Sequence, residues 1–78
     1  MREREEKCIV TFHTTTAAME MERLCKQDQI PGRLIPVPRP ITAGCGRCWA
    51  APAQAREQIE TFLIAKRVMI DGIYAVML

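Results

Sequence analysis

The chain has 78 residues, of which 49% are hydrophobic and 26% charged, a composition typical of one small globular domain rather than a disordered segment. Its net charge of +2, with acids and bases interleaved, gives neither the basic stripe of a nucleic-acid-binding protein nor an acidic tail. No apolar run is long enough for a signal-peptide core or a membrane span. We therefore expect a single cytoplasmic domain over residues 1–78, with no nucleic-acid or membrane partner.

The first half of the chain predicts a strand, a helix and a second strand. Residues 8–12, CIVTF, are rich in the β-branched and aromatic side chains that favour a strand. The threonine triplet at 14–16 can cap a helix, and apolar residues recur at helical spacing over about 16–27. Residues 33–37, RLIPV, predict the second strand. Pro36 indicates that this strand lies at an edge of its sheet, because proline cannot donate to a ladder.

The second half predicts a long connection, a third strand, a second helix and a fourth strand. Prolines and glycines between 38 and 46 indicate an irregular connection, and RCWAA at 47–51 predicts a short strand. Pro52 suits the first turn of a helix. The buried stripe of that helix is formed by Ala55, Ile59, Phe62 and Leu63. The Asp-Gly pair at 71–72 turns the chain into the last strand, IYAVML, at 73–78.

The order of these elements, βαββαβ, predicts an α+β fold of the ferredoxin-like type, a four-stranded antiparallel sheet with both helices on one face. The first and third strands then lie side by side in the middle, so the end of the first is beside the start of the third. This arrangement brings His13 and the threonine triplet next to the loop that holds Cys45. The positive end of the first helix would favour the thiolate form of Cys45.

The four cysteines divide into two kinds. Cys8 belongs to one face of the first strand and Cys25 to the apolar stripe of the first helix, so both are interpreted as small core residues. Cys45 lies between two glycines in a loop, with Arg39 and Arg47 close in sequence, which is the setting of a reactive thiol. The alternative is that the cysteine and its glycines serve only the geometry of a tight turn.

The stretch GRLIPVPRPITAGCG, which follows a strand and a threonine-led helix and precedes a helix and GIYA, carries a resemblance to a known family. It resembles the selenium/sulfur carrier-like domain family over about Cys8 to Tyr74. The most specific element is the pattern P-x-P-R-x-[IL]-[ST]-x-x-C-G, formed by Pro36 to Gly46. The resemblance implies a carrier cysteine, which would be Cys45.

The first functional hypothesis is therefore a sulfur or selenium carrier in which Cys45 accepts a sulfur atom as a persulfide. The groups expected to stabilise the resulting anion are Arg39, Arg47, Thr14, Thr15, Thr16 and Gly46. His13 is a candidate base for Cys45, or else an ordinary surface or capping residue. A second hypothesis is a non-enzymatic, dimeric interaction or regulatory module whose cysteines are incidental.

A third hypothesis is a dithiol redox protein, because Cys45 and Cys48 have the Cys-x-x-Cys spacing. In an extended strand, residues three apart are separated by about 10 Å and face opposite sides, whereas a disulfide needs Cα atoms within about 7 Å. Only a turn through Gly46 and Arg47 would permit the bond. The same spacing is half a zinc site, but further ligands would have to come from the core or from His13, so we expect neither a metal nor a cofactor.

The face of the sheet without helices is expected to be apolar. It should carry Ile9 and Thr11, together with one alternating set of the fourth strand, either 73, 75 and 77 or 74, 76 and 78. Trp49 could lie on this face or in the core. We therefore predict that a second copy of the chain, or a protein partner such as a sulfur or selenium donor, covers this face.

Overall fold

The structure is a computed structural model that describes residues 5–39, 41 and 45–78. In chain order the elements are β1 (Glu6–Thr11), α1 (Thr15–Asp28), β2 (Arg33–Pro36), β3 (Arg47–Pro52), the short 3-10 helix η1 (Ala53–Ala55), α2 (Arg56–Lys66) and β4 (Gly72–Met77). Gly44, one of the two glycines that flank Cys45 in the sequence, lies outside the described residues.

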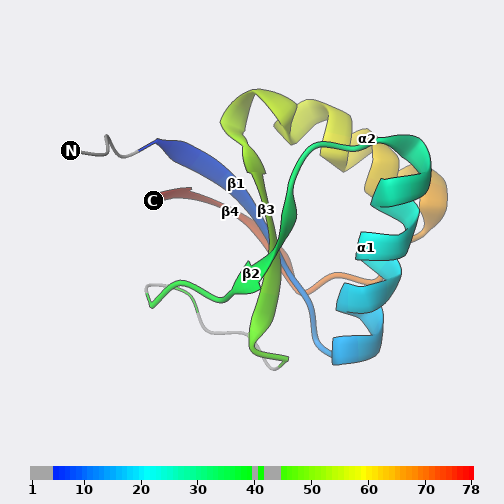
Figure 1. The fold of residues 1–78 in the computed structure, drawn as a ribbon, viewed down its shortest axis with the longest axis horizontal. Coiled ribbons are helices and arrows are strands. Elements are labelled where there is room, and N and C mark those ends of the chain that lie inside the picture. The colour runs from blue at the N-terminus through cyan, green and yellow to red at the C-terminus, as the bar shows by residue number, and fades with distance from the viewer. Residues whose placement is uncertain (1–4, 40, 42–44) are drawn as a thin grey trace.

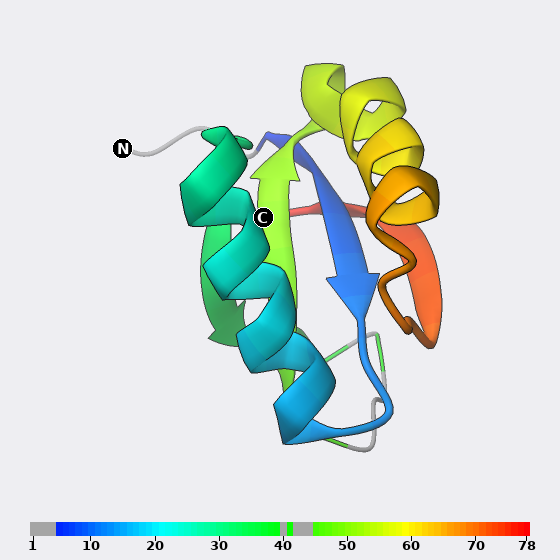
Figure 2. The same ribbon diagram turned by 90° about the vertical axis from the view of Figure 1, so that its right-hand side faces the viewer.

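The four strands form one antiparallel sheet in the order β2-β3-β1-β4. Both helices lie on one face of it, α1 over β2 and β3 and α2 over β1 and β4 (Figures 1 and 2). The predicted α+β ferredoxin-like fold is confirmed. The end of β1 lies beside the start of β3, because Thr11 is paired with Cys48. The edge position predicted for β2 from Pro36 is also confirmed.

The helix boundaries have local causes. Of the three threonines, Thr14 is the N-cap of α1: its hydroxyl oxygen accepts a hydrogen bond of 3.1 Å from the Ala17 N–H. The helix ends at Gln29, which has the left-handed φ of 55° and donates its N–H to the Cys25 carbonyl. Arg67 ends α2 in the same way, with a φ of 54°.

The main core lies between the sheet and the two helices. Its buried members come from both helices and from the faces of β1 and β3 that the helices cover, and they include Cys8, Val10, Phe12, Met21, Cys25, Trp49, Ile59, Phe62 and Leu63. Cys8 and Cys25 are therefore core residues, as predicted. Trp49 belongs to this core as well, and its indole N–H donates to the Pro31 carbonyl at 3.0 Å. The face of the sheet that carries no helix is called the open face below. A position of Trp49 on the open face is wrong, because successive residues of a strand alternate between faces and Cys48 occupies the open face.

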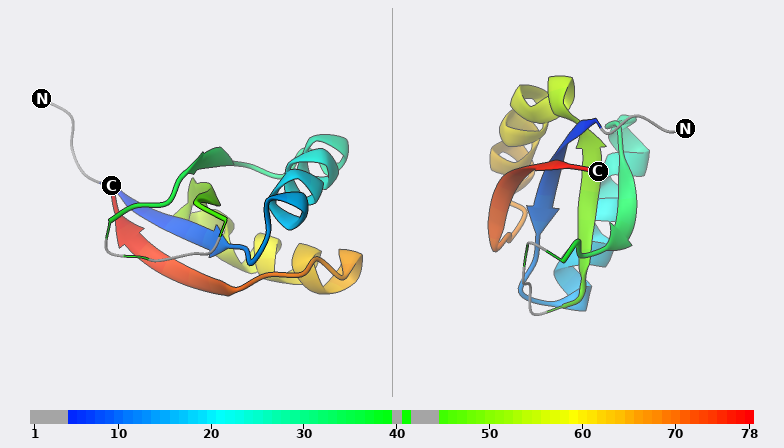
Figure 3. Two further views of the ribbon diagram at one scale, coloured as in Figure 1. Left: turned by 90° about the horizontal axis from the view of Figure 1, so that it is seen from below. Right: turned by 90° about the vertical axis from the view of Figure 1, so that its left-hand side faces the viewer.

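A second, smaller cluster covers the opposite face of the sheet. Ile9, Cys48 and Ile41 form its buried part, and Ile41 comes from the connection between β2 and β3. Half-buried residues pack around it: Ile35, Val37, Ala50 and Val76. Ile9 and Thr11 lie on this face, as predicted. The expectation that the face leaves them exposed in a single chain is wrong, since both are 0% exposed. Figure 3 views this face in its right-hand panel.

The strand register decides between the two alternatives left open for β4. Tyr74 is paired with Ile9, and Val76 packs in the same cluster as Ile9, so the alternating set Tyr74, Val76 and Leu78 lies on the open face. Ile73 packs against the main core instead. Among the described residues, neither helix has the length and apolar character that crossing a bilayer requires.

Candidate functional site: the Cys45 turn

Cys45 lies in a turn directly before β3. The next residue, Gly46, has a φ of +76°, in the left-handed region that side chains with a Cβ rarely adopt. A Cβ built at Gly46 would meet nothing within 4 Å, so the requirement for glycine is conformational rather than steric. The Gly46 carbonyl accepts a hydrogen bond of 3.1 Å from the Val37 N–H, which ties the turn to the end of β2.

The sulfur of Cys45 contacts the main chain of Arg47. Its Sγ lies 3.0 Å from the Arg47 carbonyl oxygen, to which the thiol donates, and 3.4 Å from the Arg47 nitrogen, whose N–H donates to the sulfur. The Cys45 side chain is half-buried and packs against the main core. Because a deprotonated sulfur can only accept, the Arg47 N–H is the contact that would stabilise an anion here.

Cys48 has a different environment. It is 0% exposed, it is paired with both Thr11 and Ile35, and it belongs to the cluster on the open face. Burial, and secondarily the neighbouring Cys45, raises the pKa of the Cys48 thiol to about 11. Cys45 packs against the core on the helix side of the sheet, so the two sulfurs of the Cys-x-x-Cys motif belong to different clusters, and all four cysteines are free.

The two remaining cysteines are protected in the main core. Cys8 and Cys25 are each 1% exposed. Burial raises the pKa of the Cys8 thiol, and burial together with the Asp28 carboxylate raises the pKa of the Cys25 thiol to about 12. Both thiols are therefore poor nucleophiles at neutral pH.

The groups predicted to surround Cys45 lie on three segments. Figures 1 and 2 show the start of β3 and the first turn of α1 at the same end of the molecule. The threonines of that turn are exposed, and the Thr14 hydroxyl caps the helix. Arg39 and Arg47 are exposed as well. Among the hydrogen bonds between described residues, those of the Cys45 sulfur are with the Arg47 main chain, so the roles of the threonines and guanidinium groups stay predictions.

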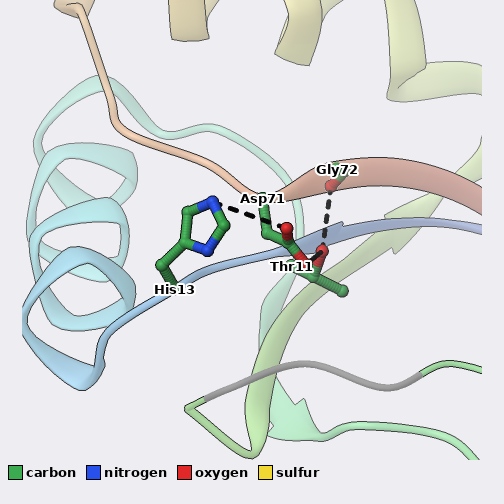
Figure 4. Close-up of polar contacts among 4 residues, drawn as sticks. All are labelled: Thr11, His13, Asp71 and Gly72. Atoms are coloured by element: carbon green, nitrogen blue, oxygen red, sulfur yellow. Dashed lines mark hydrogen bonds and ion pairs between the residues drawn. The ribbon is translucent and has the colours of Figure 1, made fainter.

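His13 is placed beside Asp71 (Figure 4). Its Nε2 lies 3.5 Å from one Asp71 carboxylate oxygen, and the other oxygen lies 3.3 Å from the hydroxyl of the buried Thr11. The same hydroxyl is 3.3 Å from the Gly72 carbonyl, so it donates to one of these oxygens at a time. The cluster ties the end of β1 to the start of β4. The role of His13 as a base for Cys45 stays a prediction.

Two hollows on the described surface are not lined by Cys45. One, of about 490 Å³, lies between the start of α1 and the end of α2 and includes His13. The other, of about 540 Å³, lies on the open face and includes Lys7 and Arg33. In the part of the chain that the structure describes, His, Cys, Asp and Glu side chains form no group of three that could hold a metal ion. Cys45 is thus a partly exposed thiol in a surface turn, outside both of these hollows.

Ile41 is the residue at this site that the sequence analysis missed. It is 8% exposed and covers Cys48, and its N–H donates to the Pro38 carbonyl at 3.0 Å. The available signal was its isolation: Ile41 is the one large aliphatic residue between 38 and 46, a stretch rich in proline and glycine, so it has to pack on something outside its own segment.

Comparison with known proteins agrees with the resemblance seen in the Pro36 to Gly46 motif. A family model described as "Putative Se/S carrier protein-like" matches residues 7–75, which include the whole of α1, β2, β3 and α2 and most of β1 and β4. Neither a curated protein nor a solved structure matches the chain. The chain therefore belongs to the Se/S carrier protein-like family.

Proposed function

We propose that this chain carries sulfur as a persulfide on Cys45, or selenium as the corresponding perselenide. The observation that carries the proposal is the exposure of the four cysteines. Cys45 is half-buried at the surface, whereas Cys8, Cys25 and Cys48 are at most 1% exposed. Membership of a Se/S carrier-like family supports the carrier role itself.

The transfer is a displacement at sulfur. The Cys45 thiolate attacks the outer sulfur of a donor persulfide, R–S–SH, and forms a new S–S bond as the donor's S–S bond breaks. The donor leaves as its thiolate, R–S⁻, and Cys45 holds the outer sulfur as a persulfide, so no external oxidant or reductant is consumed. A selenium donor would react in the same way and leave selenium on Cys45. A nucleophilic acceptor then removes the outer atom and regenerates the Cys45 thiolate.

The surroundings of Cys45 support an anionic carrier group. The Arg47 N–H already donates to the sulfur, and the first turn of α1 presents the positive end of its dipole on the same side of the sheet. Arg39 and Arg47 supply exposed positive charge close by in the chain. Because the site is open, we propose that a donor protein docks over the Cys45 turn, in the cytoplasm, where a reducing environment keeps the thiol free.

A dithiol redox function finds less support. A Cys45–Cys48 disulfide would need Cys48 to leave a fully buried position on the opposite face of the sheet, where it is paired with Thr11 of β1 and Ile35 of β2. The pKa of about 11 also makes Cys48 a poor attacking thiol at neutral pH. Cys48 is better explained as a small residue of the open-face cluster.

The test is mass spectrometry after incubation with cysteine and a cysteine desulfurase. We expect a mass increase of one sulfur atom, mapped to the peptide that contains Cys45 and removed by a thiol reductant. Cys45→Ser should abolish the gain, and the matched variant Cys48→Ser, three residues away, should retain it. A loss of two protons in place of the sulfur gain, abolished by either variant, would favour the dithiol function. Sulfur mapped to Cys48 in the folded protein would contradict the proposal.

A further inference from the structure

Among the strands that the structure describes, β4 is an edge of the sheet with no neighbour on its outer side, and it lacks the usual protection. In the order β2-β3-β1-β4 it is the outer strand beside β1 (Figure 2). Its residues, GIYAVM, include neither a charged residue nor a proline, the two devices that most often keep edge strands from pairing with other chains. Large hydrophobic side chains that are exposed also gather here, with Tyr74 at 39%, Met77 at 53% and Leu78 at 41%.

The hydrogen-bond pattern identifies which main-chain groups of β4 point outward. Leu78 and Glu5 exchange both of their main-chain hydrogen bonds, at 2.9 and 3.1 Å. Hydrogen-bonded and non-hydrogen-bonded pairs alternate along an antiparallel ladder, so the alternating residues Val76 and Tyr74 also direct their N–H and C=O groups toward β1. The N–H and C=O groups of Ile73, Ala75 and Met77 consequently point away from the sheet.

We propose that a second copy of this chain pairs with that edge, β4 against β4, antiparallel and centred on Ala75. In this register Ala75 lies opposite the partner subunit's Ala75, and Ile73 lies opposite Met77 of the partner subunit. Every outward N–H and C=O group of Ile73, Ala75 and Met77 then finds a partner, and the two sheets become one. The dimer predicted from the sequence thus forms through this edge rather than through a bare sheet face.

The chemistry of the strand favours a second copy over an unrelated partner. Two identical strands without charged residues bring no like charges together when they pair. The register also places apolar side chains opposite each other on both faces, Tyr74 against Val76 of the partner subunit on the open face and Ile73 against Met77 of the partner subunit on the other. A six-residue strand is only about 20 Å long, well short of a standard interface, so we expect a weak dimer with a Kd on the order of tens of micromolar.

The test combines sedimentation with amide exchange, both in the presence of a thiol reductant that excludes disulfide-linked dimers. Between about 10 µM and about 1 mM protein, sedimentation velocity should show the shift from monomer to dimer. Over the same range, the amides of Ile73, Ala75 and Met77 should gain protection, whereas those of Tyr74 and Val76 should be protected throughout. A monomer at the highest concentration, or a dimer that leaves the three outward amides unprotected, would overturn the proposal.

Two variants separate pairing from folding. Ala75→Pro removes an N–H that points away from β1, so it should abolish the dimer while the chain keeps its fold by circular dichroism. Met77→Lys should weaken the dimer at least tenfold by placing a charge on the edge. Met19→Lys is its matched control, because Met19 is similarly exposed, at 61%, but lies on α1. A dimer of unchanged affinity in both β4 variants would overturn the proposal. Neither variant alters the Cys45 turn, so persulfide transfer is tested separately.

Discussion

Cys45 and Cys48 are three residues apart in the sequence and have opposite environments. Cys45 lies in a turn at the surface and accepts a hydrogen bond from the Arg47 N–H, whereas Cys48 is fully buried inside β3. The boundary between them is the start of β3 at Arg47. From that point the chain is extended and successive side chains alternate between the faces of the sheet. The Cys-x-x-Cys spacing therefore does not by itself define a pair of equivalent thiols.

The same comparison explains why Cys48 is protected. Two strands flank it, and Ile41 from the β2–β3 connection lies over it on the open face. That connection leads into the Cys45 turn, so one segment both presents one thiol and buries the other. The protection of Cys48 should thus depend on Ile41, and the exposure of Cys45 on the geometry of Gly46.

The largest expected effect is on alkylation. With a pKa of about 11, Cys48 has a thiolate fraction at neutral pH that is about 300-fold below that of an ordinary thiol with a pKa of about 8.5, and burial slows its reaction further. Iodoacetamide should therefore modify Cys45 first, and Cys48 more than about 300-fold slower than free cysteine. Because the folded-state pKa is raised, the Cys48 rate should rise about tenfold per pH unit until the pH approaches that pKa.

Peptide mapping by mass spectrometry at a series of times measures both rates. The control is the chain unfolded in urea, in which all four cysteines should react at similar rates. Equal rates for Cys45 and Cys48 in the folded protein would show that the difference between the two environments does not exist in solution.

Ile41→Ala should expose the protected thiol. Removing a buried aliphatic side chain from a small cluster should lower the free energy of unfolding by about 2 kcal/mol, the low end of the range for such substitutions. Cys48 alkylation should become faster at the same time, while Cys45 alkylation changes little. Ile64→Ala is the matched control, since Ile64 is 80% exposed and should change neither quantity. Chemical denaturation and peptide mapping make the measurements, and an unchanged Cys48 rate in Ile41→Ala would mean that another residue provides the cover.

The sequence predicted the fold better than it predicted the surroundings of Cys45. Hydrophobic periodicity and turn residues depend on local chemistry, so they identified the βαββαβ order and the core positions of Cys8 and Cys25. The cover that Ile41 provides depends on where a long connection folds back, which no local pattern encodes. The contact between His13 and Asp71 joins residues 58 positions apart (71 − 13) and likewise has no local signal.

Gly46→Ala tests the geometry that presents Cys45. A Cβ would meet no neighbouring atom, so the substitution isolates the cost of the left-handed φ, about 1–2 kcal/mol in the free energy of unfolding. Asparagine tolerates this conformation better than alanine, so Gly46→Asn should cost less. Thermal or urea unfolding measures both. If alanine and asparagine are equally tolerated, the turn at Gly46 does not have the positive φ described.

The smallest expected effect is the loss of stability on replacing a threonine of the triplet. It tests whether these threonines cap α1 or stabilise the Cys45 thiolate. Thr14 alone of the three accepts the capping hydrogen bond, from Ala17, so Thr14→Ala should lower the free energy of unfolding by about 1 kcal/mol. Thr15→Ala and Thr16→Ala are matched controls and should each change it by less than about 0.5 kcal/mol, because both side chains are exposed. The dipole arises from the main chain of α1, which all three variants keep, so the alkylation rate of Cys45 should be unchanged in each. One of the three variants could instead slow Cys45 alkylation severalfold without a matching loss of stability. The hydroxyl of that threonine would then be contacting the Cys45 sulfur directly. In that case the anion-stabilising role predicted for the triplet would rest on the side chain rather than on the helix end.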